Sequence, residues 1–299
     1  MNAGKTKFDL FVFEEAEKYR GKCHPIKVSL LHRLFARKVA CKRMHPNPDD
    51  EFCNPDIGPN HEIISNYMKD LRSERNIGQP KTPFDERVML QKIDLDGYML
   101  LNGHHRWAAA MQMNVPKIRS KVVNLTQESD VEQMIQKATH DKRVALDLDE
   151  VVFRAGDGVP AEKTLPFPFN RFFPEPLRRD IPGLLQYLKG AGYDIWVYTT
   201  KYYSMDYIRR FFALYKVQVD GVVTGTARKH RLPGEGRRKL EAMIQNRYPR
   251  TIHFDNGSLV CIDSGTKDFQ EYSLSGNPDT WAREIMEIIG ALDSHEAEQ

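Results

Sequence analysis

The second half of the chain alternates short apolar segments with amphipathic ones, and this alternation constrains the fold more than any other feature of the sequence. Strands are expected at residues 144–148, 193–199, 221–224 and 251–255, and helices at residues 182–190, 204–214, 237–245 and 281–292. Strands separated by helices favour a parallel sheet covered by helices on both faces. We therefore predict an α/β domain over residues 141–292, followed by a frayed tail at residues 293–299.

Two aspartates directly follow the first of these strands. Asp147 and Asp149 lie in the segment Val-Ala-Leu-Asp-Leu-Asp-Glu-Val-Val. Ligands bind at the carboxyl ends of strands in open α/β sheets, and alternation along an extended chain would point both carboxylates the same way. The pair suits one carboxylate as a nucleophile and the other as a proton donor and acceptor, with magnesium holding phosphate beside two anions. A solvated acidic turn is the alternative interpretation.

Further polar groups follow the other expected strands. Thr199 ends one strand, and its hydroxyl is suited to bind a phosphoryl oxygen. Asp255 ends another strand and is a second metal-seeking carboxylate. Between them lie Lys229 and Lys239, either of which could neutralise phosphate charge. The order of these groups is an acid pair, a hydroxyl, a lysine and an acid.

Over residues 141–290 this order resembles the haloacid dehalogenase superfamily of phosphohydrolases. The segment Asp-Leu-Asp-Glu-Val at residues 147–151 is similar to its DxDx(T/V) motif. The resemblance implies that Asp147 forms an aspartyl phosphate, and that Asp149 protonates the leaving group and then activates water. It also implies that Thr199 binds the phosphoryl group. Magnesium would then sit on Asp147, the backbone carbonyl of Asp149, and Asp255.

Two assignments stay open within this resemblance. The family often has a second acid at or soon after its last motif, which makes Asp263 an alternative to Asp255. We prefer Asp255, because it follows the preceding helix at the usual distance. Lys239 is preferred to Lys229 because it starts the helix before that strand. The Pro-rich stretch at residues 153–176 is short, which predicts little or no cap.

The first half contains a second motif, in which an apolar strand at residues 98–101 runs through a glycine turn into an Ala-rich helix. Its residues are Asn102, Gly103, His104, His105 and Arg106. The amino end of a helix favours anions, and arginine is a bidentate phosphate donor. The histidines could bind phosphate or act as acid and base. A simple helix start with surface histidines is the alternative.

Around this motif, residues 26–125 resemble the ParB/sulfiredoxin-like fold. His104 stands where sulfiredoxins carry a catalytic cysteine, and no DNA-reading helix-turn-helix is evident, so neither of those activities is expected. The Gly-His-His-Arg form looks closest to the free-serine kinases, which implies an acidic base in an upstream loop. Among the acids of residues 49–51, Glu51 is the preferred base. We predict an extension at residues 1–25 and a nucleotide- or phosphate-binding α+β domain at residues 26–138.

Composition narrows the class of protein. The 44 basic and 41 acidic residues give a formal charge of +3, too balanced to indicate nucleic-acid binding by charge alone. No apolar run approaches the roughly 20 residues that span a bilayer, and the first residues lack the apolar core of a secretory signal. The four cysteines form no CxxC pair, so we expect reduced thiols in a cytoplasmic protein without a membrane partner.

Together these patterns predict a bifunctional phosphotransfer enzyme. Its second domain would be a magnesium-dependent phosphatase (a hydrolase) acting on a phosphorylated substrate, and its first would bind ATP or another nucleotide and could act as a kinase. Nucleic-acid end processing is an analogy, which keeps nucleic acid among the candidate partners. The alternatives are a phosphatase whose first domain only recognises substrate, and a non-enzymatic binding protein.

Overall fold

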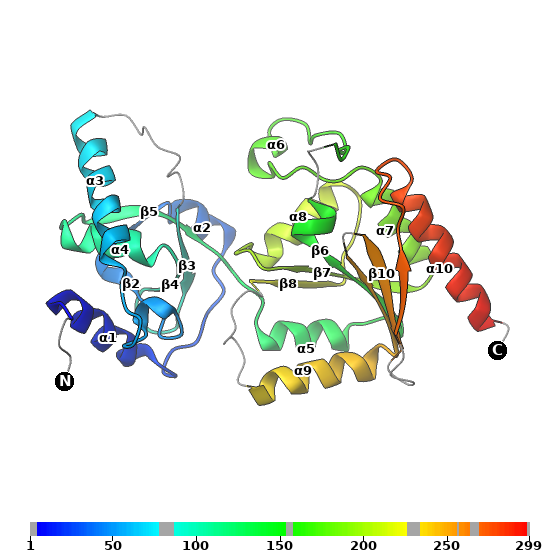
Figure 1. The fold of residues 1–299 in the computed structure, drawn as a ribbon, viewed down its shortest axis with the longest axis horizontal. Coiled ribbons are helices and arrows are strands. Elements are labelled where there is room, and N and C mark those ends of the chain that lie inside the picture. Colours follow the sequence, from blue (N-terminus) through cyan, green and yellow to red (C-terminus); the bar gives the residue numbers. More distant parts are fainter. Residues whose placement is uncertain are drawn as a thin grey trace. The chain divides into compact units, whose positions relative to one another are not determined.

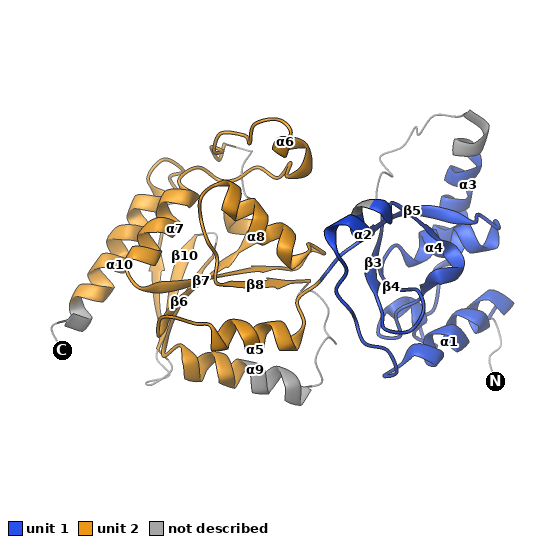
Figure 2. Cartoon of the chain, turned by 180° about the vertical axis from the view of Figure 1, so that it is seen from behind, with its two compact units in different colours: residues 1–124 blue, residues 125–299 orange. Residues whose placement is uncertain are grey.

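The chain divides into two compact units, residues 1–124 and 125–299 (Figure 2). The computed structural model describes residues 5–77, 87–153, 158–225, 234–255, 257–263 and 269–297, without the side chains of residues 34, 73–77, 234–240 and 295–297. Both units are α/β with mixed sheets, which confirms the predicted class at that level. None of the described helices is long and apolar enough to cross a membrane.

The first unit is built on a five-stranded sheet of order β1-β5-β3-β4-β2 (Figure 1). Its elements are α1 (Lys7–Tyr19), α2 (Leu30–Phe35), β1 (Lys38–Ala40), β2 (Met44–His45), α3 (His61–Ile77), β3 (Val88–Lys92), β4 (Tyr98–Asn102), α4 (His104–Gln112) and β5 (Lys117–Val122). β3 and β4 pair antiparallel as a hairpin.

The amino-terminal segment is part of this first unit rather than an extension outside the fold. Val12 and Ala16 of α1 are buried in the same core as Trp107 of α4. The indole of Trp107 also donates a hydrogen bond to the carbonyl oxygen of Cys41 at 3.0 Å. The apolar face of α1 therefore joins the core, and the separate extension expected at residues 1–25 is wrong for α1.

The second unit is built on a six-stranded sheet of order β11-β10-β9-β6-β7-β8. Its elements are α5 (Glu128–Gln136), β6 (Lys142–Asp147), α6 (Phe169–Phe172), α7 (Ile181–Gly190), β7 (Tyr193–Thr199), α8 (Met205–Leu214), β8 (Gly221–Thr224), α9 (Gly234–Arg247), β9 (Arg250–Phe254), β10 (Ser258–Asp263), β11 (Phe269–Ser273) and α10 (Trp281–Ala297). The strands β9, β6, β7 and β8 run parallel, as predicted. The sequence interpretation missed β10 and β11, which pair antiparallel and make the sheet mixed.

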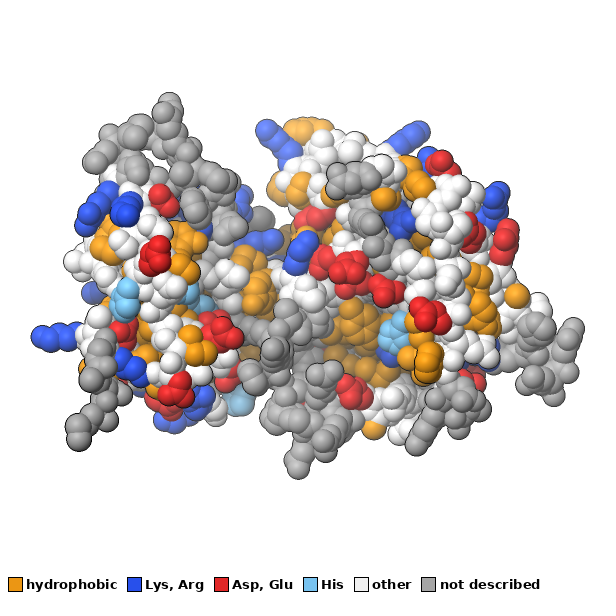
Figure 3. All heavy atoms as spheres, viewed as in Figure 1, with side chains coloured by type: hydrophobic (Ala, Val, Ile, Leu, Met, Phe, Trp, Pro, Cys, Tyr) orange, Lys and Arg blue, Asp and Glu red, His pale blue; other side chains and the backbone are white. Residues whose placement is uncertain are grey.

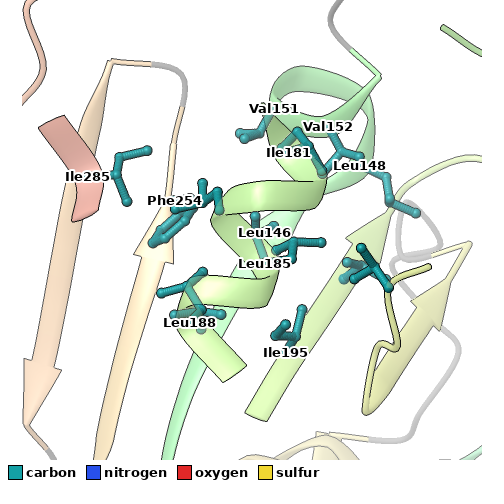
Figure 4. Close-up of a cluster of buried hydrophobic side chains, with 14 of the residues drawn as sticks. Leu146, Leu148, Val151, Val152, Ile181, Leu185, Leu188, Ile195, Phe254 and Ile285 are labelled. Atoms are coloured by element: carbon teal, nitrogen blue, oxygen red, sulfur yellow. The ribbon is translucent and has the colours of Figure 1, made fainter. Parts of the chain in front are cut away.

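Side chains of β7 alternate between two cores on opposite faces of this sheet, as expected for a strand buried on both sides. Ile195 and Val197 lie in a large cluster with the apolar residues of α7 and α10. Figure 4 shows the α7 side chains packed against the strands in this cluster. Trp196 points the other way, into a cluster with Tyr248 and the apolar face of α5. Helices thus cover both faces.

This second core corrects the predicted domain boundary. Val131, Met134 and Ile135 of α5 pack with Trp196 and Tyr248 of the second unit. The helix at residues 128–136 therefore belongs to the second unit, which begins at residue 125 rather than at residue 141. Its apolar face needs the α/β sheet to be buried, a partnership that local sequence does not reveal.

The carboxylate of Asp194, at the amino end of β7, ties the α5–β6 connection and the end of α9 to the sheet. It is fully buried and accepts hydrogen bonds from His140 Nδ1 at 2.8 Å, from Tyr248 at 2.9 Å and from Thr139 Oγ1 at 3.1 Å. Burial alone would raise the pKa of Asp194, but these donors outweigh it and lower the pKa. The acid therefore holds three segments together as an anion.

The helix α10 is also anchored to the amino ends of β6 and β7 by a carboxylate. Asp293 accepts hydrogen bonds from Lys142 Nζ at 2.8 Å and from the Tyr193 hydroxyl at 2.9 Å. It lies within α10, which continues to Ala297. The frayed tail predicted from residue 293 is therefore wrong at its first residues, because this contact fixes them.

Gly221 should be the position in the second unit least tolerant of a side chain. It pairs with Trp196 across β7 and β8, and a Cβ there would overlap the indole ring. Because the indole is buried and unable to move away, Gly221→Ala should reduce the free energy of unfolding by about 1–3 kcal/mol. Urea denaturation followed by tryptophan fluorescence measures the change.

Gly183→Ala is the matched control for this substitution. It lies in α7, and a Cβ there would meet nothing within 4 Å. Alanine also favours helix over glycine by up to about 1 kcal/mol, so this variant should be as stable as the parent or more so. Equal stability of the two variants would contradict the packing described for Gly221.

Candidate functional site

The acid pair of the second unit follows β6, but it is not arranged as strand alternation predicts. Asp147 ends the strand, and a single turn of π-helix, Leu148–Val152, begins immediately after it. One oxygen of Asp147 accepts hydrogen bonds from the backbone N–H groups of Asp149 at 2.7 Å and Glu150 at 2.8 Å. The side chain of Asp147 thus caps the turn that places Asp149. Such π turns are rare and are frequently found at functional sites.

Asp149 is turned toward the end of the neighbouring strand β7. Its Oδ2 accepts a hydrogen bond from the hydroxyl of Thr199 at 2.7 Å, and its Oδ1 lies 3.0 Å from Nζ of Lys201. The Asp149 side chain is only 13% exposed, whereas that of Lys201 is 63% exposed. The acid is therefore held inside the site by a buried hydroxyl and by an ammonium group that reaches in from solvent.

Lys201 is the cation that the sequence interpretation missed. Its backbone N–H donates to Thr199 Oγ1 at 3.1 Å, so one short turn positions both the hydroxyl and the ammonium group. Of the two lysines that were predicted, Lys229 lies outside the described residues. The helix that carries Lys239 is described, but its side chain is not. The sequence feature that could have revealed Lys201 is its position two residues after Thr199, at the end of the same strand.

Strand register separates the two candidate metal ligands. Leu146 pairs with Phe254 in the parallel β6–β9 ladder, so the next residues, Asp147 and Asp255, lie side by side on strands about 4.8 Å apart. Asp263 is paired with Arg250, at the opposite end of β9. Asp255 therefore shares the carboxyl edge with the acid pair, whereas Asp263 lies at the other edge of the sheet.

The donor set at this edge is compatible with magnesium. Among the described residues no group of three His, Cys, Asp or Glu side chains is arranged to hold a metal. Magnesium, however, is usually bound through one or two carboxylates, with waters and substrate phosphate completing its shell. Asp147 and Asp255 supply two such oxygen ligands from adjacent strands, and the backbone carbonyl of Asp149 is a third candidate.

In the first unit, the Gly-His-His-Arg motif begins α4, as the sequence predicts. Asn102 ends β4, and Gly103 has a φ of +90°, a left-handed conformation that few side chains adopt. The first turn of α4 contains no acidic side chain and no side-chain cap. The guanidinium of Arg106 lies 5.3 Å from the ring centroid of Tyr67 in α3.

The two histidines are held by the loops around this turn. His104 is buried, and its Nε2 accepts a hydrogen bond from the backbone N–H of Asn47 at 3.3 Å. Its Nδ1 lies 3.6 Å from a carboxylate oxygen of Asp50. His105 Nε2 accepts from the N–H of Asn60 at 3.2 Å. His104 is thus built into the fold, whereas His105 is half-buried.

The predicted acidic loop lies against the motif, through a different residue from the one preferred. Asp50, the cap of a short 3₁₀ helix at Glu51–Cys53, is the acid beside His104. Glu51 is exposed within that helix. The structure therefore brings the loop and the motif together through Asp50, whereas the side chain of Glu51 is exposed.

The comparisons add no family. No family model matches the chain, and neither does any curated protein or solved structure. The two arrangements of side chains are therefore interpreted from their own chemistry.

The four cysteines contribute no reactive group to either arrangement. All are free thiols, and Cys41, Cys53 and Cys261 are buried. Burial raises the pKa of Cys41 to about 11 and that of Cys53 to about 12. Thiols with such pKa values are almost entirely protonated at neutral pH, and they are poor nucleophiles.

His105 should report on the charge placed at the α4 turn. Burial lowers its pKa below the ordinary value of 6.5, against the opposing effect of Asp50. In NMR titrations its ring should therefore take up a proton at lower pH than a free histidine. Below pH 6.5 the unfolded chain binds this proton more readily, so His105 should also make the fold less stable as the pH falls.

An anion bound at the start of α4 should raise the pKa of His105, because it favours the charged ring. Adding ATP, or inorganic phosphate alone, should then shift the NMR titration of His105 upward. His24 is exposed in the same unit and is the internal control. An unchanged titration with both ligands would argue against an anion site at this turn.

Proposed function

We propose that the second unit is a magnesium-dependent phosphohydrolase of the haloacid dehalogenase type. The observation that carries the proposal is the meeting of Asp147, Asp149, Thr199 and Lys201 at the carboxyl ends of two adjacent parallel strands, β6 and β7. A nucleophilic carboxylate, a second acid, a hydroxyl and a cation within contact of one another are the groups that phosphoryl transfer needs. The spatial order of the parallel strands, β9-β6-β7-β8, supports the same proposal.

The two carboxylates divide the chemistry between them. One oxygen of Asp147 is held by the backbone of the π turn, which leaves the other to attack phosphorus. As that O–P bond forms, the bond from phosphorus to the leaving oxygen breaks, and Asp149 gives that oxygen its proton. In the second step Asp149 takes a proton from water, and the water oxygen displaces Asp147 from phosphorus.

Thr199 and Lys201 stabilise the transferring group. In the structure they contact Asp149, and phosphoryl oxygens accept charge-assisted hydrogen bonds from the same donors. Binding of substrate would release Asp149 from the ammonium group and allow it to carry a proton. Bound magnesium, held by Asp147, Asp255 and the carbonyl of Asp149, would offset the negative charge of phosphate beside the acids.

For the first unit we propose a nucleotide- or phosphate-binding site at the start of α4, in a ParB/sulfiredoxin-like domain. The first turn of this helix carries Arg106 and no acid, which suits an anion. A kinase activity is the second candidate, favoured by the contact between Asp50 and His104. A recognition module without catalysis would use the same groups. Turnover of ATP by the full chain would favour the kinase, and binding of ATP without turnover would favour the recognition module.

Asp147→Asn should abolish magnesium-dependent release of phosphate from p-nitrophenyl phosphate. The amide oxygen still accepts the two backbone hydrogen bonds, so the turn should persist while the nucleophile is lost. Lys201→Ala should reduce the rate by about 100-fold, because it removes charge stabilisation from the transition state. Release of phosphate at several substrate concentrations measures both effects.

Glu150→Gln is the matched isosteric control for the Asp147 substitution. Only the backbone N–H of Glu150 is engaged with the site, and its side chain is exposed. This variant should retain the rate of the parent. An Asp147→Asn protein that is folded by circular dichroism and still hydrolyses the ester would overturn the proposed nucleophile.

The metal assignment predicts opposite outcomes at the two candidate acids. Asp255→Asn should raise the magnesium concentration needed for half-maximal activity by at least about tenfold, because it removes a charged ligand. Asp263→Asn should leave that concentration unchanged, since it lies beside Arg250 at the far edge of the sheet. The converse result would place the metal elsewhere.

A further inference from the structure

A loop over residues 158–180 connects the π turn to α7 in the second unit, and its base is firmly fixed. The N–H of Glu162 donates to the carbonyl of Leu177 at 2.7 Å, and the N–H of Arg178 donates to that of Val152 at 2.9 Å. Leu177 is 1% exposed within the main core of the unit. The base of the loop is therefore held against the fold beneath it.

The tip of this loop, by contrast, displays large aromatic side chains to solvent. Phe167, Phe169 and Phe172 are 74%, 42% and 55% exposed. Figure 3 shows apolar and basic side chains together over α6. Single exposed apolar residues are common, but three phenylalanines within six positions of an anchored loop mark a binding surface.

A series of aromatic contacts runs from this tip to the acid pair. Phe173, which follows the tip, stacks on Tyr207 with centroids 4.7 Å apart, and Tyr207 stacks on Tyr203 at 5.8 Å. Tyr203 in turn contacts Phe153, with ring centroids 6.0 Å apart, and Phe153 directly follows the π turn that carries Asp149. The inner end of the series therefore lies against the segment that holds the acid pair.

The charge of the tip is positive. Residues 163–173 contain Lys163 and Arg171 and no acidic residue. Both side chains are exposed, and the guanidinium of Arg171 lies 5.9 Å from the ring centroid of Phe167. Glu175, the acid nearest the aromatic series, accepts a hydrogen bond from the Tyr207 hydroxyl. Exposed aromatic faces interleaved with cations suit a ligand that has planar apolar groups on an anionic chain.

We propose that the loop tip binds single-stranded nucleic acid and presents its terminal phosphate to the acid pair. The assignment of that phosphate as substrate rests on the phosphohydrolase function proposed above. Bases stack on aromatic side chains regardless of their sequence, and lysine and arginine neutralise the phosphates between them. A membrane would need only the tip and would leave the aromatic series toward Asp149 unexplained, and a phosphopeptide offers few planar groups to stack.

Fluorescence anisotropy of the full chain with a labelled 12-nucleotide oligothymidylate tests the binding surface. EDTA is included, so that binding is measured without turnover. Phe167→Ala/Phe172→Ala should weaken binding by roughly tenfold or more, because each lost stacking contact reduces the affinity for a base. Arg171→Ala should weaken binding and reduce its dependence on salt. The same double substitution should lower kcat/KM for a terminally phosphorylated form of this oligonucleotide.

Phe269→Ala is the matched control. Phe269 is 71% exposed on β11 of the same unit. Its substitution therefore removes an equally exposed aromatic ring that lies outside the loop. It should leave binding of the oligonucleotide unchanged. Equal affinity of the parent and the double variant would overturn the proposal. So would loop-dependent binding of a phosphopeptide or of phosphatidylserine vesicles in place of the oligonucleotide.

The two proposals fail in different ways. Hydrolysis of p-nitrophenyl phosphate by the parent, compared with Asp147→Asn, tests the phosphohydrolase without nucleic acid. Loop-dependent binding of the oligonucleotide by a protein that hydrolyses nothing would overturn the hydrolase and the terminal phosphate as its substrate, but would retain the binding surface. Hydrolysis without loop-dependent binding would retain the hydrolase and overturn the surface.

Discussion

The pair of hydrogen bonds from the backbone N–H groups of Asp149 and Glu150 to the Asp147 carboxylate is the contact on which the candidate site depends. It converts the end of a buried strand into a tight π turn, and that turn carries the second acid sideways toward β7. In this turn the carboxylate of Asp149 accepts a hydrogen bond from the hydroxyl of Thr199 at 2.7 Å. One side chain thus provides both the local geometry and the proposed nucleophile.

The same contact explains what could be predicted from the sequence and what could not. The apolar segment before Asp147 made the strand and its carboxyl edge predictable, and strand–helix alternation gave the parallel part of the sheet. The sequence placed Asp149 and Thr199 near the ends of two strands, but it did not predict the hydrogen bond between them. The π turn is a backbone choice with no residue signature of its own, so strand alternation was the wrong reason for the two acids to converge.

Long-range packing accounts for the other differences. The helix at residues 128–136 lies within the first domain predicted at residues 26–138, yet its apolar face is covered by Trp196 and Tyr248. The strands β10 and β11 were missed because they are short, partly polar segments that pairing stabilises, β10 with β9 and β11 with β10. Likewise, Lys201 was overlooked because lysines were sought before the later strand, and not within the turn that follows Thr199.

The acidic residues at the two edges of the second unit's sheet have different roles. At the amino edge Asp194 accepts hydrogen bonds from two other segments, so its substitution would loosen the contact between those segments and β7. At the carboxyl edge Asp255 lies exposed on a hairpin, and Lys201 extends into solvent. Selection can therefore exchange residues at the carboxyl edge with little risk to the scaffold. A protein built in this way is free to change the chemistry it performs while its descendants keep the same sheet.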